Sequence, residues 1–444
     1  MNAKVLLVGS GAREHALAAA LARSKSRPSI FAWMKQRNPG IAALADEVRV
    51  NDNYHDVIGF ARDCEVGLAI IGPEGPLRYG LADALTMLGI PTVGPTQRLA
   101  LIETEKSYAR ILLERYRISG NPKFMVFTTI SGVRKYIEEN EPVVLKPNGL
   151  TGGKGVVVQG EHFSSMTEAL AICRQILIKH QAMVIEEKLQ GEEFSLQCFC
   201  DGTTIIPCPP VQDHKRRLVG DHGLNTGSMG SYTSANHLLP FLKYRELQQA
   251  TDIVRRTIQA LQLETGEPYR GIIYGGFMLT AQGVKLIEFN ARFGDPEAIN
   301  VLALLRTDFL DICRRIACRE KYGGLNQLDI RFRGLATVVK YVVPVNYGLP
   351  KEQWVATVSD LLQIGDLGKA ALYYSSVHSD QAGLHLTKSR AVAVLGMAPE
   401  LSEAEGIAER AACAIIGAVD HRSDIGTAEL IARRVQHMKE LRRQ

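Results

Sequence analysis

A glycine-rich loop with two lysines is the first candidate for chemistry in this sequence. It reads "KPNGLTGGKGVVV", Lys146 to Val158. Loops of this kind often bind phosphate, but the P-loop pattern needs Ser or Thr after its lysine, and here Gly155 follows Lys154. The loop also joins two short β-rich runs. We therefore expect a flap that closes on a triphosphate, with Lys146 on the α- and β-phosphates; the alternative is an ordinary glycine-rich hairpin.

A carboxylate and an amide in "LIEFNARFGDPE" form the second candidate. Glu288 and Asn290 are two residues apart, so on a strand both side chains face the same way while Ile287 and Phe289 point into the core. Two hard oxygen ligands side by side suit Mg²⁺ carried by nucleotide phosphates. Arg292 follows on the same face, which indicates a site assembled around an anion.

A third stretch, residues 209–230, reads "PPVQDHKRRLVGDHGLNTGSMG" and mixes both signs of charge. Charged stretches of this length are usually solvated loops, but long loops inside compact domains are often functional. Asp213 and Lys215 are candidate site residues here. We interpret His214 as a positioning residue rather than a general base, because the chemistry inferred below needs no strong base.

The residues that end a predicted strand before Gly191 form a fourth candidate. Glu186 to Leu189 precede a backbone edge that could pair with an adenine ring, and Glu193 could then meet the ribose. The alternative is a set of solvated glutamates.

Bulk properties restrict the class of protein. A chain of 444 residues predicts two to four domains. The formal net charge of +5 is mild and scattered, so nucleic acid is not indicated, whereas small anionic ligands fit. Neither a leader sequence nor a run of eighteen apolar residues is present, so we expect a cytoplasmic protein without membrane contact.

The eight cysteines follow no disulfide spacing and suit a reducing compartment. Cys198, Cys200 and Cys208, with His214 nearby, would make an unusual zinc site because the C-x-x-C spacing is missing. On a strand, both thiols of C-x-C pack on one face as small hydrophobes. We therefore expect buried thiols without zinc.

The coarse pattern of elements predicts a multidomain α/β and α+β chain. Short apolar runs alternate with helical stretches over the first hundred residues, which indicates a Rossmann-like parallel sheet. Two strands around the flap, a helix near 165–179 and another strand suggest a compact module of its own. Hairpins with a turn at each reversal follow from residue 191. The last hundred residues predict a β-rich domain and a helix opened by a capping box, Ser402-x-x-Glu405. We expect the apolar stripe of this helix at Ile407, Ala411, Ile415 and Val419.

The N-terminal "VGSGAREHA" raises a rival class, the dinucleotide oxidoreductases. In the G-x-G-x-x-G frame, however, Glu14 replaces the third glycine, and no acid follows the second strand candidate to hold a ribose. A helix N-terminus can bind phosphate there without any dinucleotide. A third possibility is a nucleotide-binding regulator without catalysis, which the presence of both lysines, Glu288, Asn290 and Arg292 disfavours.

Taken together, the motifs resemble those of the ATP-grasp ligases, and within them the phosphoribosylamine–glycine ligases of purine biosynthesis. The resemblance is strongest in "VGSGAREHALA", "IIGPEGPL", "LKPNGLTGGKGVVV", "PPVQDHKR" and "EFNARFGDPE", and weaker after residue 345. It implies an N-terminal domain over 1–104, an ATP-grasp domain over 105–335 with a lid over about 121–190, and a C-terminal mixed domain over 336–444. It also implies ATP and Mg²⁺ or Mn²⁺ as cofactors, glycine and phosphoribosylamine as substrates, and a monomer or weak homodimer.

The resemblance also implies a role for each matching residue. It implies metal ligands at Glu288 and Asn290. The implied catalytic residues are Lys146, Lys215, Arg292 and Asp213. The implied ATP contacts are Lys106, Lys146, Gly152, Gly153, Lys154, Gly155, Glu186, Leu189 and Glu193. The implied substrate contacts are Gly11, Arg13, Glu14, Gly72, Pro73, Glu74, Asp213, Arg292, Asp295 and Pro296.

The sequence departs from the family pattern in several places. Thr151 and Gly152 replace two alanines of the flap, and Ser228 replaces a glycine. The phosphate-binding "PGN" turn is replaced by "WMKQRNPGI", and Gly276 stands where a related subset has a glutamine that ligates a second metal. The predicted reaction joins glycine to phosphoribosylamine through glycyl phosphate. An ATP-grasp ligase for another carboxylate and amine stays open.

Overall fold

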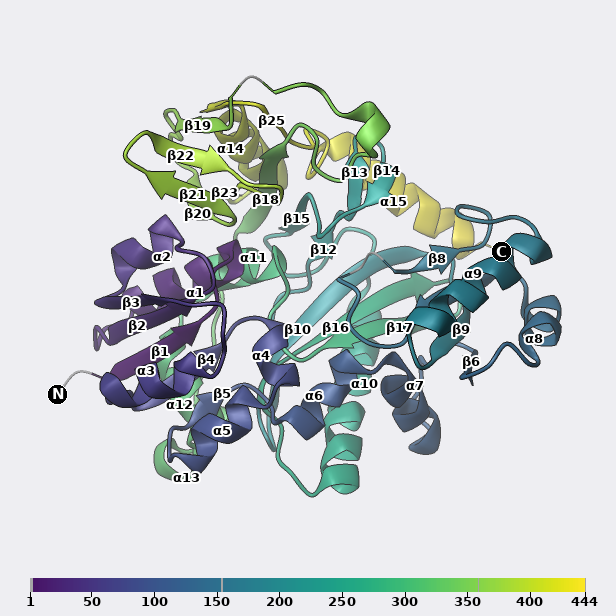
Figure 1. Ribbon diagram of the computed structural model, residues 1–444, viewed down its shortest axis with the longest axis horizontal. Coiled ribbons are helices and arrows are strands. Elements are labelled where there is room, and N and C mark those ends of the chain that lie inside the picture. Colours follow the sequence, from purple (N-terminus) through teal and green to yellow (C-terminus); the bar gives the residue numbers. More distant parts are fainter. Residues whose placement is uncertain (1–2, 153–154, 358, 444) are drawn as a thin grey trace.

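The N-terminal part forms a parallel sheet, as the alternating pattern predicts (Figure 1). The computed structural model describes residues 3–152, 155–357 and 359–443. Five parallel strands lie in the order β3-β2-β1-β4-β5. These strands are β1 (Lys4–Val8), β2 (Ser29–Met34), β3 (Glu47–Val50), β4 (Leu68–Ile71) and β5 (Thr92–Val93). The helices of this part are α1 (Ala12–Ala22), α2 (Pro39–Leu44), α3 (Asp56–Asp63), α4 (Glu74–Arg78) and α5 (Leu81–Met87).

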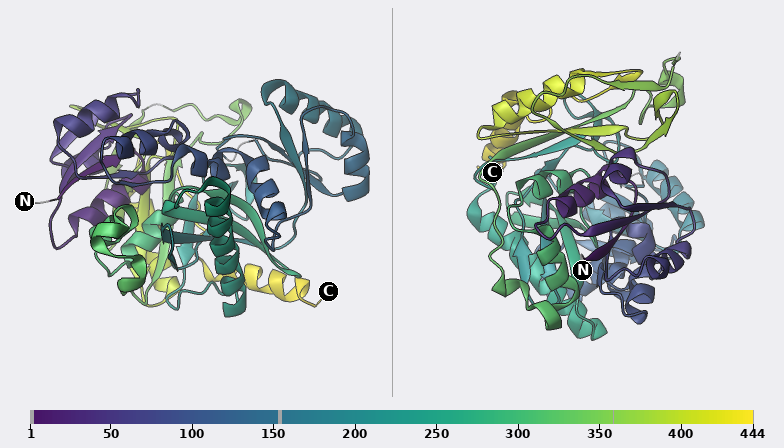
Figure 2. Two further views of the ribbon diagram at one scale, coloured as in Figure 1. Left: turned by 90° about the horizontal axis from the view of Figure 1, so that it is seen from below. Right: turned by 90° about the vertical axis from the view of Figure 1, so that its left-hand side faces the viewer.

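Two helices then lead to a small four-stranded unit with its own apolar core. They are α6 (Gln97–Thr104) and α7 (Lys106–Arg115). The unit has the strand order β6-β9-β7-β8 and projects on the side opposite the N-terminal sheet (Figure 2). Its elements are β6 (Phe124–Phe127), α8 (Val133–Asn140), β7 (Val143–Pro147), β8 (Val157–Val158), α9 (Met166–Lys179) and β9 (Met183–Glu187). Ser165 and Glu168 form a capping box at α9, so the helix predicted near 165–179 is confirmed.

The middle of the molecule is an antiparallel sheet built from the predicted hairpins. Its strand order is β11-β10-β16-β17. Its strands are β10 (Glu192–Asp201), β11 (Ile205–Pro207), β16 (Arg270–Thr280) and β17 (Gly283–Asn290). Cys198 and Cys200 are fully buried on β10, which confirms that they pack as small apolar groups. The accompanying helices are α10 (Tyr244–Thr265), α11 (Glu297–Leu304), α12 (Phe309–Ala317), α13 (Arg319–Tyr322) and the 3₁₀ turn η1 (Leu325–Gln327).

A third sheet connects the middle of the chain to its C-terminal part. Strands β12 and β15 from the middle extend the C-terminal strands in the order β12-β15-β18-β23-β20, and β25 also pairs with β18. A hairpin, β13 with β14, leads from β12 to β15. The strands named here are β12 (Gln212–Asp213), β13 (Arg216–Leu218), β14 (His222–Asn225), β15 (Gly230–Thr233), β18 (Ala336–Pro344), β20 (Ala371–Tyr374), β23 (Val392–Ala398) and β25 (Val419–Asp420). Residues 209–230 therefore contain the short strands β12, β13 and β14 and the start of β15 rather than one uninterrupted loop.

The remaining C-terminal elements comprise a second small sheet, a 3₁₀ turn and two helices, of which one packs on β18 and β23 and the other contacts β10. The small sheet has the order β21-β22-β19-β24. The elements are η2 (Lys351–Gln353), β19 (Leu361–Ile364), β21 (Val377–Asp380), β22 (Gly383–Leu386), α14 (Leu401–Cys413), β24 (Ile415–Ile416) and α15 (Ala428–Leu441). No helix within the described ranges is both long and apolar enough to cross a bilayer.

Two expectations for α14 are wrong. The helix begins at Leu401 with Glu400 at the N-cap, so Ser402 lies in the first turn and caps nothing. The helix also ends at Cys413, because the chain turns there into the short strands β24 and β25. Ile415 and Val419 therefore lie on strands and not on the helical stripe.

Candidate active site

A cavity of about 320 Å³ lies where the N-terminal part, the flap, the middle sheet and the C-terminal part meet; we call it the central cavity. Several of the residues singled out from the sequence line it. They are Arg13, Glu74, Lys106, Gly152, Glu186, Asp213, Lys215, Glu288, Asn290, Arg292 and Asp295. The others that the structure describes are not among the lining residues: Gly11, Glu14, Gly72, Pro73, Lys146, Gly155, Leu189, Glu193 and Pro296. Gly153 and Lys154 lie outside the described residues.

Strand β17 brings Glu288 and Asn290 to the central cavity by means of a β-bulge. Glu288 pairs with Gly276 on β16, but the next pair is Leu286 with Phe277, so Ile287 is an extra residue. Because Leu286 is buried, strict alternation would turn Glu288 into the core as well. The bulge at Ile287 reverses this and presents Glu288 to the cavity. The prediction that Phe289 is buried is confirmed, whereas the prediction that Ile287 points into the core is wrong, since it is half-buried and lines the cavity.

Glu186 is the centre of a buried ion-pair triad on the wall of the cavity. Its two carboxylate oxygens accept hydrogen bonds from Arg110 at 2.8 and 2.9 Å and from Lys146 Nζ at 2.7 Å. Both cations also donate to the carbonyl oxygen of Ile287, the bulged residue, at 2.7 and 3.3 Å. Burial alone would raise the pKa of Glu186, but Arg110 and Lys146 together lower it. The triad fixes Lys146 beneath the strand that carries Glu288.

The base of the flap is tied to the start of α7. Lys106 Nζ donates to the carbonyl oxygen of Gly149 at 2.6 Å, and Ser107 N donates to Asn148 Oδ1 at 3.0 Å. Asn148 Nδ2 in turn donates to Glu105 Oε2. Burial lowers the pKa of Lys106. The base of the flap is therefore fixed, because Lys106, one of the predicted ATP-binding lysines, is bonded directly to its backbone.

Lys215 lies between carboxylates of two strands. Its Nζ is 2.9 Å from Glu193 Oε2 on β10, and Asp213 on β12 also lines the cavity. Burial opposes the charge on Lys215, but Glu193 and Asp213 raise its pKa overall. Burial also raises the pKa of Asp213. Lys215 is therefore a permanent cation facing the cavity.

Arg292 connects the middle sheet to the N-terminal part. Its guanidinium lies 3.2 Å from Glu74 Oε2 and 3.0 Å from Glu103 Oε1, and it donates to the carbonyl oxygen of Phe293 at 3.1 Å. Arg292 lowers the pKa of Glu74 to about 2. Burial raises the pKa of Glu103 to about 7. Arg13 reaches the same carbonyl of Phe293 at 3.0 Å, so two guanidinium groups converge on one oxygen.

The predicted residues of the N-terminal turn form a packed support next to this pair. Glu14 Oε2 accepts a hydrogen bond from Gly11 N at 2.7 Å, and Glu14 Oε1 accepts one from Arg13 at 2.6 Å. A Cβ atom on Gly72 would lie 2.2 Å from Glu14 Oε1, so this position accepts only glycine without a shift. Pro73 is the N-cap of α4, whose first residue is Glu74.

Asp295 faces C-terminal residues that the sequence interpretation missed. Its Oδ2 pairs with Arg390 at 3.0 Å, and its Oδ1 accepts a short hydrogen bond from Tyr341. The Arg390 guanidinium lies over the Tyr341 ring at 4.2 Å. Pro296 is the N-cap residue of α11 and stands just behind Asp295. Nothing local in "SRAVAV" marks Arg390, because its partner is 95 residues away.

Three further lining residues had no functional interpretation from the sequence. Glu103 and Arg110 sit on helices whose apolar neighbours give no sign of a cavity. Glu297 belongs to the quoted "GDPE" and accepts a hydrogen bond from Tyr274 at 3.0 Å. Burial raises the pKa of Glu297 to about 7. The signal that the sequence offered for Glu297 was its place in the "GDPE" motif together with Asp295.

Comparisons with known proteins assign the family. A family model described as the N domain of phosphoribosylglycinamide synthetase matches residues 3–103, and one described as its ATP-grasp domain matches residues 104–298. A phosphoribosylamine–glycine ligase of Methanosarcina barkeri is 45% identical over 99% of this chain and 100% of its own length. The chain belongs to the phosphoribosylamine–glycine ligase family. Another member, from Methanocella arvoryzae, is 44% identical with the same coverage.

Solved structures agree with this family at the level of the fold. A phosphoribosylamine–glycine ligase from Thermotoga maritima superposes with a TM-score of 0.78 and 23% identity, covering 95% of this chain and 99% of that one. A biotin carboxylase from Campylobacter jejuni has a TM-score of 0.70 and 14% identity, with 98% and 95% coverage. Phosphoribosylamine–glycine ligases are ATP-grasp enzymes that use ATP and a divalent metal ion. The resemblance seen in the motifs is confirmed, and the oxidoreductase alternative is not.

Proposed function

We propose that the chain joins glycine to 5-phosphoribosylamine at the expense of ATP, giving glycinamide ribonucleotide, ADP and phosphate. The observation that carries the proposal is the central cavity itself. It gathers the flap, the Glu288–Asn290 pair and the N-terminal turn around one space. That is the arrangement needed to hold a nucleotide, an amino acid and a ribose phosphate together.

The reaction requires activation of a carboxylate. Oxide is a poor leaving group, so transfer of the γ-phosphoryl group to glycine gives a glycyl phosphate from which phosphate can leave when the amine attacks. The protein contributes positioning and charge stabilisation. Lys106 and Lys146 are proposed to hold nucleotide phosphates, and the flap, including Gly152 and Gly155, is proposed to exclude water that would hydrolyse the acyl phosphate.

A divalent cation fits the cavity for two reasons. Glu288 and Asn290 offer adjacent hard oxygen donors, and the described lining holds six cationic side chains against seven carboxylates. A lining with this balance does not neutralise a triphosphate by itself. We propose Mg²⁺ or Mn²⁺ held by Glu288 and Asn290, which would offset phosphate charge. Gly276 lies opposite Glu288 and has no side chain to offer a further ligand.

The substrate roles divide between two sides of the cavity. Asp213, Lys215, Arg292, Asp295 and Pro296 are proposed to surround glycine and its acyl phosphate. Lys215 and Arg292 supply positive charge for the carboxylate and the acyl phosphate. The proposed phosphoribosylamine contacts are Gly11, Arg13, Glu14, Gly72, Pro73 and Glu74. The proposed adenosine contacts are Glu186, Leu189 and Glu193, with the Glu186 contact through its backbone because its carboxylate is occupied.

A ligase for another carboxylate and amine is the second candidate, favoured by the replaced "PGN" turn near Asn38. We also propose a cytoplasmic enzyme that acts on small molecules, without nucleic acid or membrane, as a monomer or weak homodimer.

The test is ADP formation with glycine and phosphoribosylamine each included, omitted and replaced by other amino acids and amines. We expect turnover only when both are present. Glu288→Gln should lower kcat/KM about 100-fold, since one lost electrostatic partner costs about 3 kcal/mol. Lys285→Gln is the matched control, because it lies on the same strand and pairs with Glu187 at 3.6 Å outside the cavity. Near-normal turnover of Glu288→Gln would overturn the metal assignment, and ADP formation with another pair would replace the substrate assignment.

A further inference from the structure

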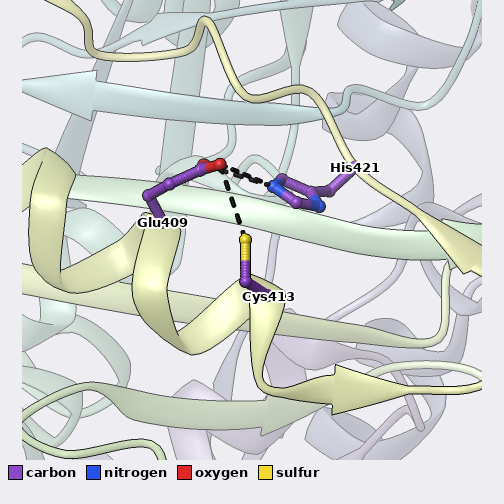
Figure 3. Close-up of side chains that lie close together, drawn as sticks. All are labelled: Glu409, Cys413 and His421. Carbon is purple, nitrogen blue, oxygen red and sulfur yellow. Dashed lines mark hydrogen bonds and ion pairs between the residues drawn. The ribbon is translucent and has the colours of Figure 1, made fainter.

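A cluster of three different metal-binding side chains lies in the C-terminal part, outside the central cavity (Figure 3). Glu409 and Cys413 are four residues apart on α14 and so share one face, and His421 directly follows β25. His421 Nε2 is 3.1 Å from Glu409 Oε1, and Cys413 Sγ is 3.7 Å from the same oxygen. One donor atom from each of the three side chains lies within 4.8 Å of the other two.

We propose that Glu409, Cys413 and His421 bind a Zn²⁺ ion or a similar thiophilic divalent cation. Thiolate, imidazole and carboxylate are the three ligand types that zinc takes in proteins. The cation would replace the hydrogen bonds that now join the three side chains. Since Cys413 is exposed, a fourth position would be open to water.

The surroundings orient the Glu409 carboxylate for this purpose. Lys340 is fully buried, and its Nζ donates to Glu409 Oε2 at 2.5 Å, to Glu405 Oε1 at 2.6 Å and to the carbonyl oxygen of Ser423 at 2.8 Å. These bonds fix the carboxylate so that Oε1 faces Cys413, while His421 Nε2 contacts both oxygens, at 3.1 Å from Oε1 and 3.2 Å from Oε2. Hydrogen bonds to ligating carboxylates are a usual outer layer of metal sites.

The local charge is suited to a divalent cation. One ammonium, Lys340, faces two carboxylates, Glu405 and Glu409, which leaves a formal charge of −1. Metal binding would release the Cys413 thiol proton to solvent and bring the charge of the ligand set to −2, which a divalent cation balances. In the metal-free protein, burial and then Glu409 raise the pKa of the Cys413 thiol, so the thiol stays protonated and can donate to the carboxylate.

The competing interpretation is an ion-pair and hydrogen-bond network that packs α14 against β18 without any metal. The metal site and the metal-free network differ in which segments of the chain they connect. A metal would join α14 to the segment after β25, where Arg422 donates to Asp221 at 2.9 Å and to the carbonyl oxygen of Arg216 at 3.1 Å. A bound ion would therefore stabilise the hairpin next to Lys215 as well as the helix.

The experiment is a titration of the full chain with Co²⁺ in excess Mg²⁺, which fills the oxygen-ligand site of the central cavity. We expect one equivalent of Co²⁺ per chain, a thiolate-to-cobalt charge-transfer band, and displacement by Zn²⁺. Cys413→Ser should abolish the band. His421→Asn should weaken binding by more than about tenfold, because even outer partners of metal ligands account for about 10- to 100-fold in affinity.

Cys318→Ser is the matched control and should keep the band, because Cys318 is also partly accessible but lies at the end of α12, away from the cluster. Zn²⁺ should raise the Tm of the wild-type chain and of Cys318→Ser, but not that of Cys413→Ser. The proposal fails if the wild-type chain gives no thiolate band, or if Cys413→Ser retains it. Either failure leaves the proposed ligase activity unaffected, since ADP formation does not depend on this cluster.

Discussion

Replacing Glu186 by glutamine tests the electrostatics at the wall of the central cavity. The Glu186 side chain is 4% exposed and holds two cations, Arg110 in a two-point contact and Lys146 at 2.7 Å. Glutamine keeps the shape and one acceptor oxygen but removes the negative charge. Arg110 and Lys146 would then face each other without a counter-ion in a buried place.

The expected cost follows from burial. Removing one partner of a buried ion pair costs about 3–5 kcal/mol of folding free energy, because the remaining charges are left uncompensated. Glu187→Gln on the same strand is the control. Its side chain is 29% exposed and lies 3.6 Å from Lys285, so its loss should cost less than about 1 kcal/mol.

The assay is urea unfolding followed by circular dichroism at several pH values. Because Arg110 and Lys146 lower the folded-state pKa of Glu186 below 4.5, its contribution is present above about pH 4.5 and is lost as the pH falls through the lower folded value. The difference in the free energy of unfolding between wild type and Glu186→Gln should therefore become smaller at acid pH. Equal stabilities of Glu186→Gln and Glu187→Gln at neutral pH would refute the assignment of this triad as a buried, charged unit.

Two further changes test the packing and the buried acids. Gly40→Ala should destabilise the chain by about 1–3 kcal/mol, since the new Cβ would lie 2.0 Å from the His15 ring. Gly59→Ala is the control: its new Cβ would have nothing within 4 Å, so this variant should be neutral or slightly stabilised in thermal unfolding. Equal Tm values for the two variants would contradict this. Burial raises the pKa of Glu103 from 4.5 to about 7, so its contribution to stability is lost as the pH rises through this range. In urea titrations, the stability of wild type relative to Glu103→Gln should therefore fall by about 2–3 kcal/mol between pH 5 and 8. A difference that does not change with pH would show that Glu103 titrates normally.

The sequence predicts those elements whose apolar residues recur with a regular local spacing. The parallel strands, the α9 helix and the hairpins of the middle sheet follow from short apolar runs and turn residues, and all are present. The pairing of Glu288 with Asn290 on one face also follows from strand periodicity. The bulge at Ile287 does not, because it depends on how β17 pairs with β16 and not on any residue type in β17.

Residues that act through distant partners could not be found in this way. Arg390 meets Asp295, and Glu103 meets Arg292, across long separations in the chain. The signal at Ser402 failed because a Ser-x-x-Glu pattern forms a capping box only if its serine is the N-cap residue. Here the N-cap is Glu400, two residues earlier.

The replaced "PGN" turn has a physical explanation in Asn38, which is buried. Its Oδ1 accepts from Gly40 N and from the next backbone nitrogen at 3.0 and 3.1 Å, so it caps α2. Its Nδ2 donates to the carbonyl oxygens of Ser10 at 3.0 Å and Tyr374 at 2.8 Å. One side chain therefore joins the N-terminal turn, α2 and strand β20. Ser10 lies one residue before Gly11, so Asn38 links the proposed amine pocket to the C-terminal sheet at the place where this sequence departs from the family pattern.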